Sequence, residues 1–176
     1  MNLSRLVPFL ETTTEFQALL ARLRAGTATA ESIETLEAAR PFALAALSDV
    51  SARPLLVITA RPERAKQLFA ELQAWSATPD RVLHFAEPEP LLYERLPWSP
   101  EAIATRLATL GALSGNENRR AVVVTTVRAL MPHTVTPEEF RAGTMVLRRG
   151  ETVTPALMLT RWSELGYESE PVVEAP

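Results

Sequence analysis

Three short apolar segments, separated by two amphipathic ones, constrain the fold of this chain more than any other feature. The apolar segments cover residues 54–60, 81–85 and 121–126. Between them, apolar residues recur with helical periodicity over 62–75 and 100–114. Strands that alternate with helices of this length form parallel sheets with helices on both faces. We therefore predict an α/β fold with a parallel sheet, whose first and third strands are buried on both faces.

Further helices are predicted on either side of these strands. Residues 14–25 show helical spacing that Gly26 is expected to end, and residues 38–49 predict a second helix. In the segment 100–114, Ser99 is the expected N-cap. We expect four residues of that helix to form its buried stripe: Ile103, Leu107, Leu110 and Leu113.

The character of the sequence changes at residues 132–137, which we interpret as a linker. Beyond it we expect a helical turn that ends at Phe140, strands over 144–148 and 167–174, and a helix from Pro155. We expect Met158, Trp162 and Leu165 on the inward face of that helix and Gly166 at its end. The sequence stops directly after the last predicted strand, so we expect this second domain to be truncated.

Composition excludes several classes of function. Eighteen basic and 21 acidic residues leave a net charge of −3, too balanced to attract nucleic acid through overall charge. The absence of cysteine excludes disulfides, thiolate zinc sites and cysteine nucleophiles. No apolar run approaches the ~18–20 residues of a membrane span, and the N-terminus lacks a signal-peptide pattern. We expect a cytoplasmic protein.

A nucleotide site is the first function to test in such a fold, because a glycine-rich loop before a helix cradles phosphate. The appropriate junction, residues 32–37, has no glycine, no lysine and two carboxylates. Lys66, the only lysine of the chain, lies in a different predicted helix. The histidines, His84 and His133, are far apart, and we expect His84 to be a packed or edge residue. We predict no catalytic, cofactor-binding or metal site.

Charged and aromatic residues outside these helices offer weaker signals. Arginine doublets at 119–120 and 148–149 are either solvated charges or contacts to an acidic partner or a phosphate backbone. In the proline-rich loop 86–100 we interpret Glu87 and Glu89 as a solvated face. The same loop holds an aromatic group that forms either a binding surface or a packing contact: Tyr93, Arg95 and Trp98.

Residues 84–113 resemble the N-terminal region of the bacterial transcription-repair coupling factors (Mfd). The family order of a turn, a helix start and a helix is found in Leu92-Tyr93-Glu94-Arg95, Ser99-Pro100 and Arg106-Leu-Ala-Thr-Leu110. The sequence has Leu91-Leu92 where the family more often has Leu-Pro.

Other segments extend this resemblance along most of the chain. Residues 54–75 and 120–131 resemble the Ia-type motif and a later strand of superfamily-two helicases. Near the end, three short segments resemble the start of a domain shared with UvrB: 147–150, 165–167 and 172–174.

The resemblance implies two domains. Residues 1–135 would form a degenerate, helicase-like UvrB-like domain 1a of the P-loop NTPase type, and residues 136–176 the beginning of a UvrB-type interaction domain 2, a small α+β domain. It implies a non-catalytic module that serves UvrA recruitment and regulation of the DNA translocase that removes stalled RNA polymerase in nucleotide excision repair. ATP, Mg and the contacts with RNA polymerase and DNA would belong to other parts of the full-length protein.

Partner contacts are expected mainly in the second domain, at Arg148, Arg149 and Tyr167, with Arg95 and Trp98 as candidates in the first. We expect weak UvrA binding by the chain alone, because the family's next strand is not included. One alternative is the nucleotide-binding half of UvrB or a superfamily-two helicase. Against it stand the missing phosphate loop and the few residues between Tyr93 and Ser99, too few for UvrB's β-hairpin. The other alternative is a small α/β enzyme that uses Arg95 and the loop with Glu87 and Glu89.

Overall fold

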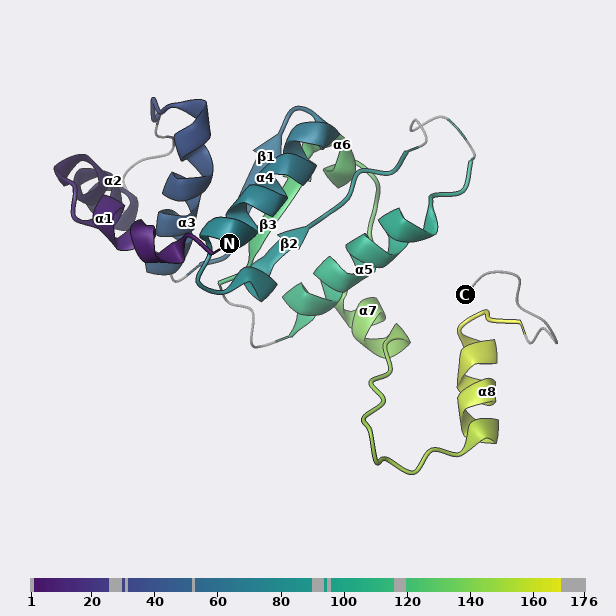
Figure 1. Ribbon diagram of the computed structural model, residues 1–176. Helices are drawn as coiled ribbons and strands as arrows, with labels where there is room; N and C mark the ends of the chain where they lie inside the picture. The colour runs from purple at the N-terminus through teal and green to yellow at the C-terminus, as the bar shows by residue number, and fades with distance from the viewer. Residues whose placement is uncertain are drawn as a thin grey trace. The chain divides into compact units, whose positions relative to one another are not determined.

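The computed structural model divides into two compact units, residues 1–134 and 135–176 (Figure 1). It describes residues 2–25, 30, 32–51, 53–89, 94, 96–115 and 120–168. Gly26, the expected helix end, lies outside these residues.

The first unit is built on a three-stranded parallel sheet. Its strands are β1 (Leu55–Thr59), β2 (Val82–His84) and β3 (Val122–Thr126), in the order β1-β3-β2. In the register, Val124 of the central strand lies opposite Val57 on one side and His84 on the other. The prediction of an α/β fold with a parallel sheet is confirmed, and the helicase-like identity of the fold stays a prediction.

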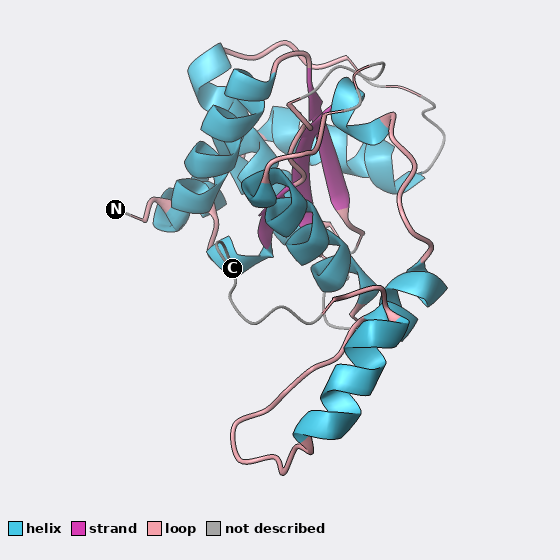
Figure 2. Cartoon of the chain, turned by 90° about the vertical axis from the view of Figure 1, so that its right-hand side faces the viewer, coloured by secondary structure: helices cyan, strands magenta, loops and turns pink. Residues whose placement is uncertain are grey.

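Helices cover the sheet on both faces (Figure 2). On one face, α4 (Pro62–Trp75) packs against the strands, and α3 (Arg40–Val50) packs against α4. At the N-terminus, α1 (Val7–Glu11) packs on α3 and contacts η1 (Ser4–Leu6) and α2 (Thr14–Ala25). Two further short turns are η2 (Glu37–Ala39) and η3 (Pro79–Arg81). The other face carries α5 (Pro100–Ser114) and α6 (Val127–Leu130) over a smaller core.

Local sequence signals explain where these helices begin. Pro62 opens α4 at a position where its missing N–H costs nothing, and Glu63 follows in the first turn. Ser99 is the N-cap of α5, because its hydroxyl oxygen accepts the N–H of Ala102 at 3.2 Å. This cap is as predicted.

The burial of β1 differs from the prediction. β3 is buried along its whole length, whereas Leu56 and Ile58 of β1 remain 53% and 49% exposed. The reason is position: β1 is an edge strand, and the core beneath α5 and α6 involves residues of β2 and β3. An apolar run does not distinguish an edge strand from a central one.

The predicted buried stripe of α5 is wrong except at Leu110, which packs against the smaller core. Three of its members, Ile103, Leu107 and Leu113, are 42–48% exposed, and the buried face consists of Ala102, Arg106 and Thr109. Carbonyl groups at the ends of β2 and α6 need donors, and this face supplies them. Thr109 donates its hydroxyl hydrogen to the His84 carbonyl at 3.0 Å, and Arg106 donates to the carbonyls of Ala86 and Ala129.

The second unit contains two helices, α7 (Pro137–Gly143) and α8 (Pro155–Glu164). Residues 144–148 form no strand, because none of the described residues of this unit offers a pairing partner. Of the other predicted strand, 167–174, residues 167 and 168 are not strand and the remainder lies outside the described residues. α7 continues to Gly143, three residues beyond the expected end.

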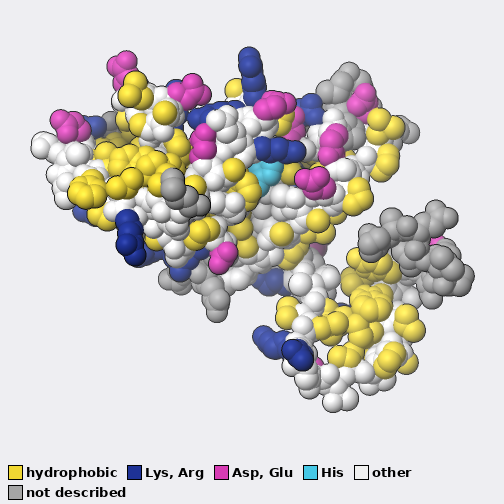
Figure 3. Space-filling model, viewed as in Figure 1, with side chains coloured by type: hydrophobic (Ala, Val, Ile, Leu, Met, Phe, Trp, Pro, Cys, Tyr) yellow, Lys and Arg dark blue, Asp and Glu magenta, His cyan; other side chains and the backbone are white. Residues whose placement is uncertain are grey.

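No described residue of this second unit is buried. The predicted inward face of α8 is therefore wrong: Trp162 and Leu165 are 38% and 43% exposed. Hydrophobic side chains instead gather on the surface of α8 (Figure 3). The physical reason is that the described part of the unit provides no sheet against which this face could pack.

Candidate functional site

Two cavities lie at the carboxyl ends of the parallel strands, where α/β folds place their ligand sites. The first, of about 380 Å³, lies beyond β2 and β3 between the beginnings of α4 and α5. The second, of about 640 Å³, lies at the end of β1 beside α3 and α4.

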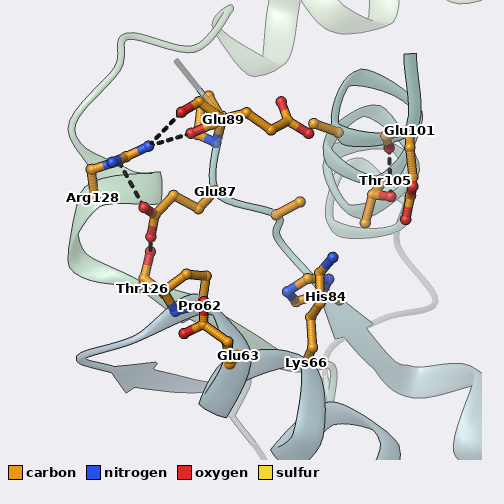
Figure 4. Close-up of a pocket in the computed structure, with 13 residues that line it drawn as sticks. Pro62, Glu63, Lys66, His84, Glu87, Glu89, Glu101, Thr105, Thr126 and Arg128 are labelled. Atoms are coloured by element: carbon orange, nitrogen blue, oxygen red, sulfur yellow. Dashed lines mark hydrogen bonds and ion pairs between the residues drawn. The ribbon is translucent and has the colours of Figure 1, made fainter. Parts of the chain in front are cut away.

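A polar network crosses the first cavity and joins the segment after β2 to the start of α6 (Figure 4). The Glu87 carboxylate lies 2.7 Å from Nε of Arg128 and accepts the Thr126 hydroxyl hydrogen at 2.5 Å. Thr126 also caps α6 by accepting the N–H of Ala129 at 3.1 Å. Arg128 donates to the carbonyl of Pro88 at 2.6 Å. Glu87 is thus engaged with protein groups, and its interpretation as part of a solvated face is wrong.

The second carboxylate of this segment, Glu89, is tied to the start of α5. It accepts hydrogen bonds from the Ser99 hydroxyl at 2.5 Å and from the Ser99 backbone N–H at 3.3 Å. Both bonds favour the charged carboxylate and therefore lower the pKa of Glu89, and the bond from the Ser99 hydroxyl is the largest cause. Glu87 and Glu89 therefore hold the loop rather than form an acid–base pair.

Lys66 and His84 lie side by side at the rim of the same cavity (Figure 4). The His84 ring stacks on Phe69 with centroids 5.6 Å apart, so the expectation of a packed histidine is confirmed. Burial lowers the pKa of His84, and the charge of Lys66 lowers it further against the opposing effect of Glu101. The imidazole is therefore neutral at neutral pH. Lys66 is exposed and makes no ion pair with a described residue.

The charges around this cavity disfavour an anionic ligand. Four carboxylates line it against two cations: Glu63, Glu87, Glu89 and Glu101 against Lys66 and Arg128. Among the residues that the structure describes, no group of three potential ligands could hold a metal ion. The arrangement serves to hold two loops in place.

The second cavity contains the junction that a phosphate loop would occupy. Residues 32–36 have no regular structure and lead into η2, and Thr35 and Glu37 line the cavity. The Glu37 carboxylate lies 3.6 Å from Nε of Arg64, which also lies 3.4 Å from Glu71. A carboxylate of the chain thus faces a cation that a phosphate could otherwise bind. The absence of nucleotide binding stays a prediction.

Arg106, part of the helix motif Arg106–Leu110 but not predicted to be buried, ties the loops together. Arg106 is 4% exposed and donates from Nη1 to the carbonyls of Ala86 at 3.0 Å and Ala129 at 2.9 Å. Its guanidinium lies 3.9 Å from the Phe85 ring centroid and 5.0 Å from that of Trp98. Nη2 is buried and finds no hydrogen-bond acceptor among the described residues. Burial lowers the Arg106 pKa. No spacing signal in the sequence distinguishes it from a surface arginine.

The partner-binding candidates fall in different places. Arg148, Arg149 and Tyr167 are exposed in the second unit, and Arg148 lies 3.8 Å from the Glu151 carboxylate. Trp98, in the first unit, is half-buried against Arg106, which favours the packing interpretation for this side chain. Arg95 lies outside the described residues, as do Tyr93 and Arg119. The structure therefore brings none of the first unit's candidates together into one site within its described part.

No helix among the described residues is long and apolar enough to cross a membrane. No protein-family model matches the chain. The chain is 26% identical over 169 residues to the transcription-repair-coupling factor of Bacillus subtilis. The match covers 96% of this chain and 14% of that protein. The chain is thus distantly similar, along nearly its whole length, to a small part of a transcription-repair-coupling factor.

Proposed function

We propose that this chain is a non-catalytic N-terminal module of a transcription-repair coupling factor. In this role it recruits UvrA and regulates the translocase that removes stalled RNA polymerase from lesions. The observation that carries the proposal is the similarity over 96% of the chain to the Bacillus subtilis protein. A match of this extent favours a common architecture over a shared short motif.

The geometry of the carboxyl edge supports a non-catalytic role. Glu87 is engaged by Arg128 and Thr126, and Glu37 faces Arg64. A nucleotide would have to displace these contacts and place its phosphates among carboxylates. Titration calorimetry with Mg–ATP should therefore detect no binding, and micromolar affinity would instead favour the nucleotide-binding half of a helicase.

The same charges predict little affinity for damaged duplex DNA. The net charge is −3, and nonspecific phosphate contacts weaken steeply as salt rises. A fluorescence anisotropy titration at physiological salt should show no preference for a lesion-containing duplex. Salt-resistant binding with such a preference would contradict the proposal that this chain does not itself recognise damaged DNA.

We assign the UvrA contact to the second unit, where Arg148, Arg149 and Tyr167 are exposed. Interface energy is commonly concentrated in arginine and aromatic residues of this kind. The test is a pull-down with purified UvrA that compares the 176-residue chain with its Arg149→Glu/Tyr167→Ala variant. The third sample is an extended version in which the residues that follow the matched region of the Bacillus subtilis protein are appended to the chain.

We expect weak capture by the 176-residue chain, loss of that capture in the double variant and strong capture by the extended version. Arg24→Glu, a charge reversal on the exposed end of α2, is the control and should bind like the unchanged chain. Equal, tight binding by the unchanged chain and the double variant would place the contact in the first unit and refute the assignment.

A further inference from the structure

The outer edge of β1 carries backbone groups that no described residue pairs with. The Leu55 N–H donates to the Ala121 carbonyl at 2.9 Å, so Leu55, Val57 and Thr59 point their backbone groups toward β3. Alternation along the strand turns the N–H and C=O of Leu56 and Ile58 away from the sheet. Backbone groups in this position are a template for an added strand.

The side chains on one face of this edge are apolar and exposed. Leu56 and Ile58 are about half exposed. Next to Leu56 lies a cavity of about 380 Å³ whose lining contains no charged residue and includes Leu113, Leu130 and Pro132. Exposed edge strands are normally protected by charged residues, proline or bulges. β1 has none of these within its five residues, Leu-Leu-Val-Ile-Thr.

The other face of the same edge combines an apolar floor with positive charge. The 640 Å³ cavity lies there, with Leu44, Leu47 and Val57 in its lining. Arg40 and Arg61 also line it, are exposed, and form no ion pair with a described residue. The one carboxylate in the lining belongs to Glu37, which already faces Arg64.

We propose that the β1 edge is a strand-addition site for an extended segment of a partner protein in which acidic and apolar residues alternate. Successive side chains of an added strand point to opposite faces of the sheet. The acidic side chains lie toward Arg40 and Arg61, and the apolar ones lie against Leu56, Ile58 and Leu113. The backbone of Leu56 and Ile58 supplies the new hydrogen bonds. This inference does not depend on the role in repair.

The probe is a fluorescent ten-residue peptide of alternating valine and glutamate, titrated against the full chain and followed by anisotropy. A peptide with five valines followed by five glutamates has the same composition without the alternation, and a valine–lysine peptide reverses the charge. We expect the alternating valine–glutamate peptide to bind at least about tenfold more tightly than either. Equal binding of all three would overturn the proposal.

Two variants test the residues that carry the site. Arg40→Glu/Arg61→Glu should weaken peptide binding at least about tenfold, whereas Arg24→Glu should not change it. Ile58→Pro removes an N–H from the outer edge, where proline is tolerated, and should weaken binding similarly. Far-UV circular dichroism and exchange protection of the Val57 amide, which faces β3, verify that each variant keeps its sheet.

Amide hydrogen exchange distinguishes strand addition from other binding modes. Peptide binding should slow the exchange of the Leu56 and Ile58 amides while the Val57 amide stays protected throughout. Peptide binding without this change would refute the proposed mode. Slow exchange of both amides before peptide is added would also refute it, because the edge would then already be occupied by the chain itself or by a second copy.

Discussion

The two units of this chain contain amphipathic helices that begin alike and end up in different surroundings. α4 and α8 both start with a proline in the first turn. α4 buries Ala65, Leu68 and Leu72 against the sheet, whereas α8 has no buried residue. An amphipathic pattern therefore predicts that a helix forms, but a buried face requires a second apolar surface in the same unit.

The largest effect that tests this comparison is the removal of a core leucine. Leu72 is 1% exposed, and Leu72→Ala should lower the free energy of unfolding by about 3 kcal/mol, since it leaves a cavity. Leu159→Ala in α8, at a side chain 51% exposed, should change it by less than about 0.5 kcal/mol. Urea unfolding followed by circular dichroism measures both, and equal losses would show that α8 is packed as tightly as α4.

The next effect concerns Arg106, which couples two loops of the first unit. Arg106→Met keeps much of the apolar volume but leaves the carbonyls of Ala86 and Ala129 without this donor. We expect a loss of about 2 kcal/mol in the same urea experiment, because unsatisfied buried acceptors are costly. Arg148→Met, at an exposed arginine of the second unit, is the control and should be nearly neutral. A neutral Arg106→Met would mean that these carbonyls find other donors.

A smaller and local effect is expected at the end of α8. Gly166 has φ +91°, and its N–H and that of Tyr167 bond to the carbonyls of Ser163 and Trp162, as in a Schellman motif. Gly166→Ala should destabilise this helix end by about 1 kcal/mol, seen as faster exchange of the Tyr167 amide. Gly115→Ala, at the end of α5, has an ordinary φ of −81° and room for a Cβ, so it should have little effect.

The smallest effect is a response to pH shared by both units. A hydrogen bond from the backbone N–H of Thr136 is the largest cause that lowers the pKa of Glu139 from its ordinary 4.5, and the Thr136 side chain adds to the effect. Hydrogen bonds from Ser99 lower the pKa of Glu89 in the same direction. A lowered carboxyl pKa stabilises the fold above pH 4.5, and this stabilisation is lost as the pH falls through the lowered value.

Nuclear magnetic resonance spectra recorded through this acid range should show the Thr136 amide losing its folded shift before the Ala102 amide. α5 is also held by buried residues, whereas α7 has none. Glu139→Gln keeps a hydrogen-bond acceptor that does not titrate and should remove the response at Thr136. Simultaneous loss at both amides would show that the two helix starts are equally supported.

Local sequence signals predicted most of the elements of the first unit. Apolar runs located the three strands, and Pro62 and Ser99 marked helix starts close to those observed. These signals work because capping and periodicity depend on residues only a few positions apart. The same reasoning failed at residues 144–148, since an isolated strand cannot form without a partner.

The buried face of α5 could not be predicted in this way. The apolar stripe of Leu107 and Leu113 and the buried face of Arg106 and Thr109 are adjacent on the helix. Which of them meets the sheet depends on carbonyls at His84 and Ala86 that need donors, and these lie about 20 residues away in sequence. The link between Glu87 and Arg128 likewise joins segments that only the folded chain brings together.

The exposed position of Lys66 at the rim of the first cavity has a practical consequence. Because it is the only lysine, an amine-reactive dye under mildly alkaline conditions modifies one side chain, apart from the α-amino group of Met1. The dye would then sit beside His84, Glu63 and Glu101, at the edge where β2 and β3 end. The chain thus offers a single side chain to which an optical reporter of that edge can be attached, with no engineered residue.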